Sequence, residues 1–275
     1  MAPVFDKEND YEWNIEYYNT LINSFPDFLH FKEYTASFFN QNQISYICFK
    51  DATFIGRVAY HEYNGANFVS FQDTYLMRAI IYKRYNFQLY NYDVKTFNDL
   101  HITFNERKNG KLTINKKARN LMNFEEIKSF LEWHKQNITY INCENMSFKE
   151  QVETMVNTDI FMLVDGGATT NLIFMLPFSG ILDILVPLNF DTRFQDLALM
   201  ADIYHSFISE TNFTLMSTDC REKYHDTIAP ELVDSPCTGL IHMSREIYVD
   251  KTQVLIYLFR LKVTVLYKKY HDISY

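Results

Sequence analysis

The segment from Phe161 to Pro187 constrains the fold of this chain more than any other part of it. It reads FMLVDGGATTNLIFMLPFSGILDILVP: an apolar run, an Asp-Gly-Gly turn, a stretch of small and hydroxylated residues, and a second apolar run. The pattern predicts a strand, a tight turn, a short helix, a loop and a second strand. Backbone N–H groups and the positive end of a helix then meet at the turn, which suits a phosphate or diphosphate group. Many α/β proteins use such a turn only for packing, so the segment alone leaves both interpretations open.

Strand and helix patterns alternate along the rest of the chain. Such alternation predicts an α/β fold with a mostly parallel sheet. Asn123 is expected to cap one helix, Ser147 and Glu150 fit a capping box, and Asp250 opens the last helix. The predicted helices lie within residues 11–40, 68–84, 124–136, 147–157 and 195–204, and the predicted strands at 44–49, 52–59, 101–104, 138–141 and 181–186.

The alternation restarts near residue 98, which predicts two domains. The expected division is an N-terminal domain of residues 1–97, a C-terminal domain of residues 98–250, and a last helix at 251–275 that crosses back to the first domain. The apolar part of this helix, interrupted by Arg260 and Lys262, is too short to span a bilayer, so we expect a docking helix.

Composition excludes several classes of function. The formal net charge of −8 over 275 residues argues against a nucleic-acid backbone as the main ligand. The four cysteines show no Cys-x-x-Cys spacing, which argues against a zinc site. The acidic, polar N-terminus is typical neither of a signal peptide nor of a membrane anchor.

Two further segments, together with part of the segment described first, carry a more specific signal. ITFNERKNGKLTIN spaces Arg107, Lys111 and Asn115 four residues apart, SFKEQV holds the pair Glu150-Gln151, and VDGGATTNLIFMLPFSGILD follows. In order and spacing, over Ile102 to Tyr204, they resemble glycosyltransferase family 61, which includes plant β-1,2-xylosyltransferases and animal N-acetylglucosaminyltransferases. HEYNGANFVSFQDTYL aligns less closely with the family's N-terminal half. The departures from the family pattern are Lys111 in place of arginine, Val69 and Asp165 in place of histidines, and Asp183 in place of glutamate.

The resemblance implies a GT-B-like enzyme, in which two Rossmann-like domains face a cleft, and an inverting reaction. The implied donor is a UDP-sugar, with UDP-xylose favoured over UDP-N-acetylglucosamine, and the implied acceptor is a glycan or glycoprotein. No Asp-x-Asp motif occurs in the chain, so we expect no metal and no other cofactor.

The resemblance also assigns roles to residues. Asp73 is expected to be the general base that takes the acceptor proton, and Arg107 to neutralise the leaving diphosphate, which a guanidinium can meet through two oxygens. Lys111 and Asn115 support Arg107. The other residues expected around the donor are Asp165, Gly166, Gly167, Thr169, Thr170, Asn171 and Asp183. Structural support is an equally good interpretation of Asp183. The Asp165 carboxylate would repel a diphosphate, so its alternatives are a sugar hydroxyl, a basic neighbour or the cap of the following helix.

Two alternatives stay open at this stage. One is a catalytically silent sugar- or nucleotide-binding protein on the same scaffold, suggested by the replaced histidines. The other is an unrelated Rossmann-like enzyme that uses the glycine turn for a different phosphate ligand. Without an anchor, a soluble member from a bacterium, a protist or a large DNA virus of the chlorovirus kind is expected, located in the (host) cytoplasm; a secretory-lumen location would require a trimmed sequence.

Overall fold

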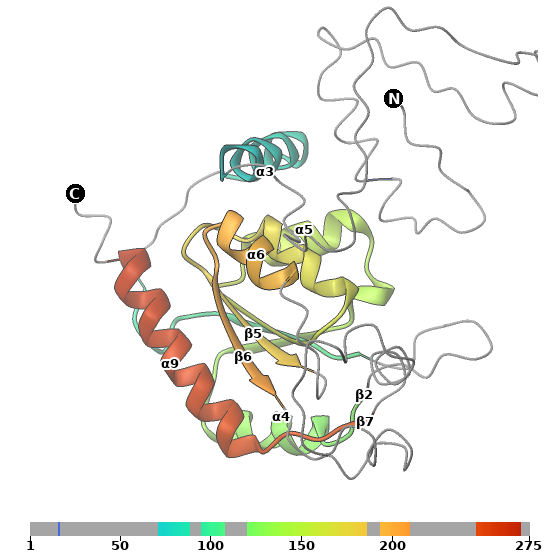
Figure 1. Ribbon diagram of the computed structural model, residues 1–275, viewed down its shortest axis with the longest axis vertical. Helices are drawn as coiled ribbons and strands as arrows, with labels where there is room; N and C mark the ends of the chain where they lie inside the picture. The colour runs from blue at the N-terminus through green and yellow to red at the C-terminus, as the bar shows by residue number, and fades with distance from the viewer. Residues whose placement is uncertain are drawn as a thin grey trace, which may run out of the picture.

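The structure is a computed structural model that describes residue 16 and residues 71–88, 95–107, 120–185, 193–209 and 246–270. Helices and strands alternate through most of this part of the chain (Figure 1). The elements, in order, are α3 (Phe71–Tyr85), β1 (Ile102–Asn105), β2 (Asn120–Leu121), α4 (Phe124–Trp133), β3 (Ile138–Ile141), η1 (Cys143–Asn145), α5 (Phe148–Val156), β4 (Ile160–Val164), η2 (Gly167–Phe174), β5 (Gly180–Leu185), α6 (Arg193–Met200), β6 (Tyr204–Ser209), β7 (Glu246–Ile247) and α9 (Lys251–Tyr270).

Five strands form one parallel sheet in the order β3-β1-β4-β5-β6, which confirms the predicted α/β class. The central strands β1 and β4 are buried along their whole length, as continuous apolar runs in a parallel sheet should be. β2 and β7 form a separate, short parallel pair. The arrangement is Rossmann-like.

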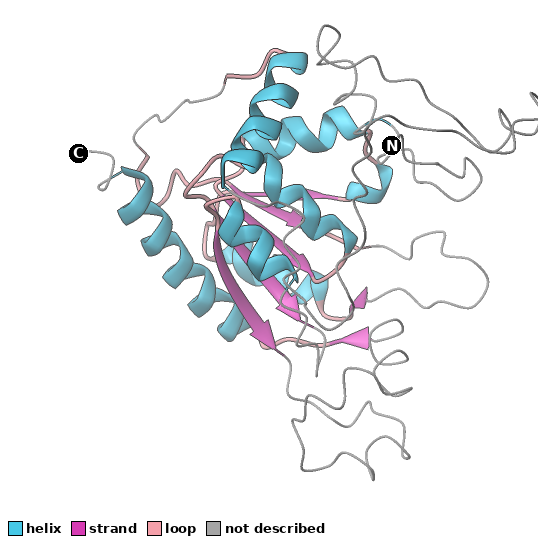
Figure 2. Cartoon of the chain, turned by 45° about the horizontal axis from the view of Figure 1, so that its top comes forward, coloured by secondary structure: helices cyan, strands magenta, loops and turns pink. Residues whose placement is uncertain are grey.

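Helices cover both faces of the sheet and make two apolar cores (Figures 1 and 2). On one face, α4 and α9 pack over residues such as Ile102, Met162 and Leu182. On the other face, α5, η2 and α6 pack over Phe161, Leu163 and other strand residues. The alternation of neighbouring side chains between the two cores follows from the period of two in a strand.

α9 closes the first of these faces. Its start follows the prediction, because the Asp250 carboxylate accepts hydrogen bonds from the backbone N–H groups of Thr252 (2.7 Å) and Gln253 (3.0 Å). It then packs along β5 and β6. A Cβ on Gly180 would lie 2.8 Å from Leu261 Cδ1, so the missing side chain lets the helix approach β5 closely. The predicted packing of this helix on residues 1–97 stays a prediction.

α3 packs on the other side of the molecule (Figure 1), against η2, and Arg78 of α3 donates to the Ala201 carbonyl just after α6. Met77, Ile81 and Tyr82 belong to the same core as α5 and η2. Residues 71–88 therefore lie against the part of the chain predicted as the second domain. Most of residues 1–97 fall outside the described residues, and the predicted division into domains stays a prediction.

Two local predictions were wrong and one is confirmed. The capping box of Ser147 and Glu150 is present at the start of α5. Asn123 makes no side-chain cap for α4; its amide instead donates to the Val249 carbonyl at 2.7 Å and so ties this helix to the segment before α9. The helix predicted to run to Tyr204 ends at Met200, and Tyr204 begins β6.

Candidate functional site

The order of the strands singles out one position on the sheet. β1 and β4 are neighbours, but the chain leaves β1 through α4 on one face and leaves β4 through η2 on the other. Loops that diverge from the carboxyl ends of adjacent parallel strands mark the topological switch point, where open α/β sheets bind their ligands. Glu106 and Arg107 follow β1 at this point, and Asp165, Gly166 and Gly167 follow β4.

Arg107 and Gly166 meet there. A Cβ built on Gly166 would lie 2.8 Å from Arg107 Nη1 and 3.7 Å from its Cζ, so the guanidinium occupies the space that a side chain would fill. Arg107 also makes a long ion pair, 3.7 Å from Nε to Glu144 Oε1, and its side chain is 21% exposed. A Cβ on Gly167 would meet no atom within 4 Å. The structure thus brings together two of the predicted site residues, Arg107 and Gly166, and open space lies next to them beside Gly167.

Four buried residues form a polar layer next to this contact, namely Asn105, Cys143, Gln151 and Asn171. The Asn105 side chain, at the end of β1, accepts from the Cys143 N–H at 2.9 Å. Gln151 Nε2 donates to the carbonyls of Cys143 and Met146, both at 3.0 Å, while its Oε1 accepts from Asn171 Nδ2 at 2.8 Å. The layer therefore links β1, the turn after β3, α5 and η2, the elements on which the Arg107–Gly166 contact is built.

The Cys143 thiol belongs to this layer as a structural group. Burial raises its pKa to about 12, although the contact with Asn171 Nδ2 partly opposes that shift. A thiol with so high a pKa stays protonated at neutral pH and is a poor nucleophile.

The side-chain oxygen of Asn171 in the same layer, Oδ1, is buried and has no hydrogen-bond partner among the described residues.

The hydroxyl groups of the glycine turn are engaged within the turn itself. The Gly166 N–H donates to Thr169 Oγ1 at 3.3 Å, and the Thr169 N–H donates back to the Gly166 carbonyl at 2.9 Å. Thr170 Oγ1 donates to the Gly167 carbonyl at 2.7 Å. In this state the two threonines stabilise the start of η2, and their predicted contact with a donor stays a prediction.

The two aspartates predicted near the donor are buried. Asp165 continues the ladder of β4, since its N–H donates to the Ile184 carbonyl at 3.0 Å. Asp183 lies inside β5, paired in register with Leu163. Its Oδ2 lies 3.4 Å from His205 Nε2 on the neighbouring strand β6. Asp183 is thus a buried residue of the sheet whose carboxylate faces His205 on the neighbouring strand.

Asp73 is not brought to this edge. It lies exposed in the first turn of α3, and the hydroxyl of Tyr75, half a turn later, donates to Asp202 Oδ2 at 2.8 Å. Asp202 precedes β6, so this end of α3 lies near the amino ends of the strands, opposite the Arg107–Gly166 contact. Lys111 and Asn115 lie outside the described residues.

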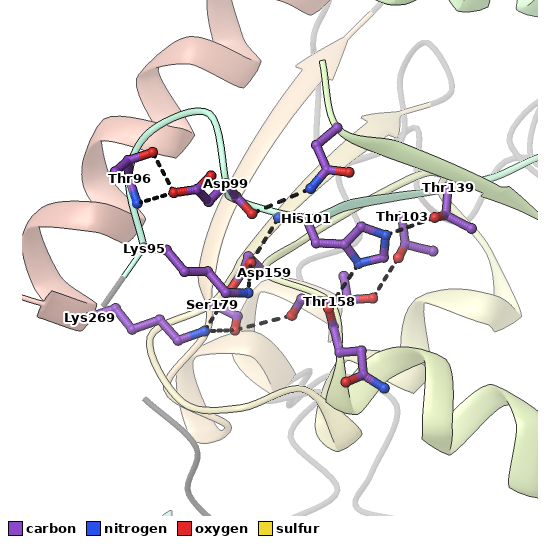
Figure 3. A network of polar contacts seen from close by, with 12 residues as sticks. Lys95, Thr96, Asp99, His101, Thr103, Thr139, Thr158, Asp159, Ser179 and Lys269 are labelled. Carbon is purple, nitrogen blue, oxygen red and sulfur yellow. Dashed lines mark hydrogen bonds and ion pairs between the residues drawn. The ribbon is translucent and has the colours of Figure 1, made fainter. Parts of the chain in front are cut away.

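A second polar cluster lies at the amino end of β4 (Figure 3). Asp159 accepts from Lys95 Nζ (2.6 Å), Lys269 Nζ (2.8 Å) and the His101 N–H (2.8 Å). Burial alone would raise the pKa of this carboxyl, but Lys269 and these hydrogen bonds outweigh burial and leave the pKa lowered. A cavity of about 410 Å³ adjoins the cluster and is lined by Lys95, Lys269, Asp159 and Glu153.

This cluster, which we call the Asp159 clasp, is better explained as a structural ion-pair network than as the predicted donor site. Both ammonium groups already share the Asp159 carboxylate, and the acidic Glu153 lines the same cavity. The Asp159 clasp joins α9 and the segment before β1 to the start of β4. His101 is structural as well, since its ring contacts the Asn157 carbonyl and the Thr139 hydroxyl.

The residues missed by the sequence analysis are Asn105, Cys143 and Glu144. Asn105 ends β1, and the other two directly follow β3, at the same edge as Arg107. The sequence did hold a signal for these residues, because the residues after predicted parallel strands share one edge of the sheet.

Among the described residues, no helix is long and apolar enough to cross a membrane, and no group of His, Cys, Asp or Glu is arranged to hold a metal ion.

The sequence model of the family described as Glycosyltransferase 61 matches residues 15–182, more than half of the chain. The matched region includes α3, both halves of the Arg107–Gly166 contact and the polar layer next to it. No curated protein shows significant similarity to the chain.

Proposed function

The chain belongs to glycosyltransferase family 61, and from this premise we propose that it is an inverting enzyme that moves xylose from UDP-xylose to a hydroxyl group of a glycan. Membership makes it a glycosyltransferase, with a sugar donor and a glycan acceptor. The nature of the sugar, the stereochemistry and the residue roles are the proposed part. UDP-N-acetylglucosamine is the second choice of donor.

One observation supports the proposal above the others: the Arg107 guanidinium lies against Gly166 at the switch point of the sheet. Negative charge grows on the diphosphate as the sugar leaves, and a guanidinium can donate to two of its oxygens. Glycine at position 166 lets the cation lie directly over the turn. A positioned cation that meets developing charge is commonly among the largest contributions to catalysis.

The start of η2 adds a second favourable element. The first N–H groups of a helix lack intrahelical acceptors, and here they follow Gly166 in the chain. Open space lies beside Gly167. We therefore propose that the diphosphate lies between the Arg107 guanidinium and the Gly167 end of η2, while Gln151 and Asn171 hold the two sides of the site in place.

Three carboxylates are candidates for the base that takes the acceptor proton. Asp73 remains the base proposed from the family resemblance, and to act it must come within hydrogen-bond reach of the acceptor oxygen beside the Arg107–Gly166 contact, because the attacked carbon carries the diphosphate. Two carboxylates lie closer to the Arg107 edge: Glu106, whose N–H donates to the Ile141 carbonyl at 2.7 Å, and Glu144, the ion-pair partner of Arg107. We propose the order Asp73, Glu106, Glu144 for testing, because only Asp73 matches the family pattern.

The wider arrangement is also a proposal. Residues 98–250 would bind the nucleotide sugar and residues 1–97 would face them as the acceptor side of a GT-B enzyme. Charge neutralisation would come from Arg107 and Lys111 in place of a metal, in line with the absence of an Asp-x-Asp motif from the sequence.

A thermal-shift screen of UDP, UDP-xylose and UDP-N-acetylglucosamine tests the donor. A ligand at a hundred times its Kd should raise the Tm by roughly 5–10 °C for a chain of this size. Release of UDP in the presence of glycan acceptors then measures turnover. EDTA should leave the rate unchanged, and a rate restored only by added metal would contradict the metal-free mechanism.

Variants assign the roles. Arg107→Ala should abolish most of the UDP release, whereas Arg84→Ala, at an exposed arginine of α3, is the matched control. Asp73→Asn, Glu106→Gln and Glu144→Gln, compared at saturating donor, identify the base as the variant that loses turnover by orders of magnitude but still binds UDP. Binding of a UDP-sugar without any turnover would instead favour a silent binding protein, the alternative that Asp165 and Val69, in place of the family histidines, support.

A further inference from the structure

α9 carries a second apolar face, on the side opposite its buried one. Ile256, Phe259, Val263 and Tyr267 are each between 45% and 58% exposed and recur at intervals of three and four residues. Such spacing puts them on one side of the helix. Among the described elements, α9 lies at the outer edge of the molecule in both views (Figures 1 and 2). The four side chains therefore form an outward ridge, which we call the α9 ridge.

The charge of α9 is opposite to that of the chain. The chain as a whole has a formal net charge of −8, yet residues 251–270 include five basic residues and no acidic one. Lys262 and Lys269 are buried and Lys251 pairs with Glu126, so the cations beside the ridge are Arg260 and Lys268. Arg260 is exposed next to the ridge, and its guanidinium lies 5.5 Å from the centre of the Tyr257 ring. Lys268 lies 5.8 Å from the Tyr267 ring. Aromatic rings beside lysine and arginine are typical of the boundary between lipid and water.

We propose that the α9 ridge binds the surface of an anionic lipid bilayer. Interfacial helices combine an outward apolar face with flanking cations, and they bury that face to a depth of about 5–10 Å among the headgroups. α9 can do so without leaving the protein, because Val254, Leu258, Leu261 and Val265 keep its inner face packed on the sheet.

The shape and charge of the ridge favour lipid over other occupants. A peptide partner is usually recognised in a groove or along a sheet edge, whereas the ridge is the convex side of a single helix. A second copy of the chain packed through the same face about a twofold axis would bring the two sets of Arg260 and Lys268 together, and like charges there would repel. An anionic bilayer accommodates both the convex apolar ridge and its basic border.

Vesicle flotation of the full chain tests the proposal. The protein should float with vesicles made of equal parts of phosphatidylcholine and phosphatidylserine, and much less with pure phosphatidylcholine or at high salt. The double variant Ile256→Asp/Val263→Asp should reduce the partition coefficient at least tenfold. Arg260→Ala should reduce it by roughly fivefold, the effect of one basic residue near an anionic surface.

The matched control is Leu199→Asp on α6, because Leu199 is equally exposed but lies over the opposite face of the sheet. It should float like the wild type. Every substituted side chain is exposed, so all variants should fold. Circular dichroism of each variant checks this and so distinguishes loss of folding from loss of binding. No flotation with either vesicle, or flotation unchanged in the double variant, would overturn the proposal. So would light scattering that shows a dimer lost in the double variant but no vesicle binding, because the ridge would then be a contact between copies.

Discussion

Gly166→Ala places one methyl group where the Arg107 guanidinium now lies. The new Cβ would be 2.8 Å from Nη1, whereas ordinary contacts of this kind begin at 3.4 Å. Nη1 must therefore retreat by about 0.6 Å. The backbone at Gly166 is extended, with φ of 164° and ψ of −168°, so alanine fits there without strain. Replacing glycine at such a position stabilises a protein by about 0.4–1 kcal/mol through the unfolded state.

Activity should move in the opposite direction. Hydrogen bonds from a guanidinium to an anionic oxygen are about 2.7–2.9 Å long, and a retreat of about 0.6 Å takes one of them to the limit of hydrogen bonding. Loss of a whole donor to developing charge costs about 10²–10³ in kcat. Because Arg107 keeps its other N–H groups, we expect Gly166→Ala to lower kcat by roughly 10- to 100-fold while the Tm stays level or rises.

A double-mutant cycle makes the test specific. UDP release at saturating donor is measured for Gly166→Ala, Arg107→Ala and the double variant, and thermal melts are recorded for each. If the alanine acts by displacing the guanidinium, it should have almost no further effect once Arg107 is gone. Gly167→Ala is the comparison, because its methyl group meets no atom within 4 Å and its N–H is kept; its loss should be at least tenfold smaller. Additive effects of the two substitutions, or wild-type turnover in Gly166→Ala, would refute the reasoning.

Three further outcomes follow from the described contacts. Arg107→Ala should lower kcat by about 10²–10³ with little change in the urea midpoint, because its ion pair with Glu144 is long and partly exposed; a large loss of stability would make the residue structural. Asp159→Asn should lower the free energy of unfolding by about 3–5 kcal/mol in urea, since Lys269 is left buried beside a neutral group. The lowered pKa of Asp159 means that its contribution is present above the ordinary value of 3.8 and is lost as pH falls through the folded pKa; acid titration of the variant should lack this loss. Gln151→Ala should cost about 1–3 kcal/mol in thermal or urea unfolding, since buried partners lose their bonds, and equal stability of variant and wild type would contradict the polar layer.

The sequence predicted the centre of the fold well because local signals and tertiary packing agree there. Apolar runs at Ile102, Ile138 and Ile160 became parallel strands, and the Ser147 capping box set the start of α5 where the spacing placed it. The meeting of Arg107 with the glycine turn was also predictable, since both follow strands that the fold class makes parallel.

Other features depend on contacts that no local pattern encodes. No strand was predicted over Tyr204–Ser209, and the predicted helix ran on to Tyr204, because this segment mixes polar and apolar residues and becomes a strand through its pairing with β5. Asn123 looks like a cap in sequence, yet a partner 126 positions away takes its amide. The exposed position of Asp73 follows from how α3 lies on η2, which sequence spacing does not specify.

The lateness of α9 in the chain has a consequence for biosynthesis. The strands it covers are all translated before it, and Val254, Leu258, Leu261 and Val265 are what closes their second face. A nascent chain that has emerged only as far as β6 therefore lacks the helix that, in the described part of the chain, packs on the apolar face of β5 and β6. Ribosome-associated chaperones should engage it at that stage, and release should coincide with the emergence of the last two turns that bring Lys269 to Asp159.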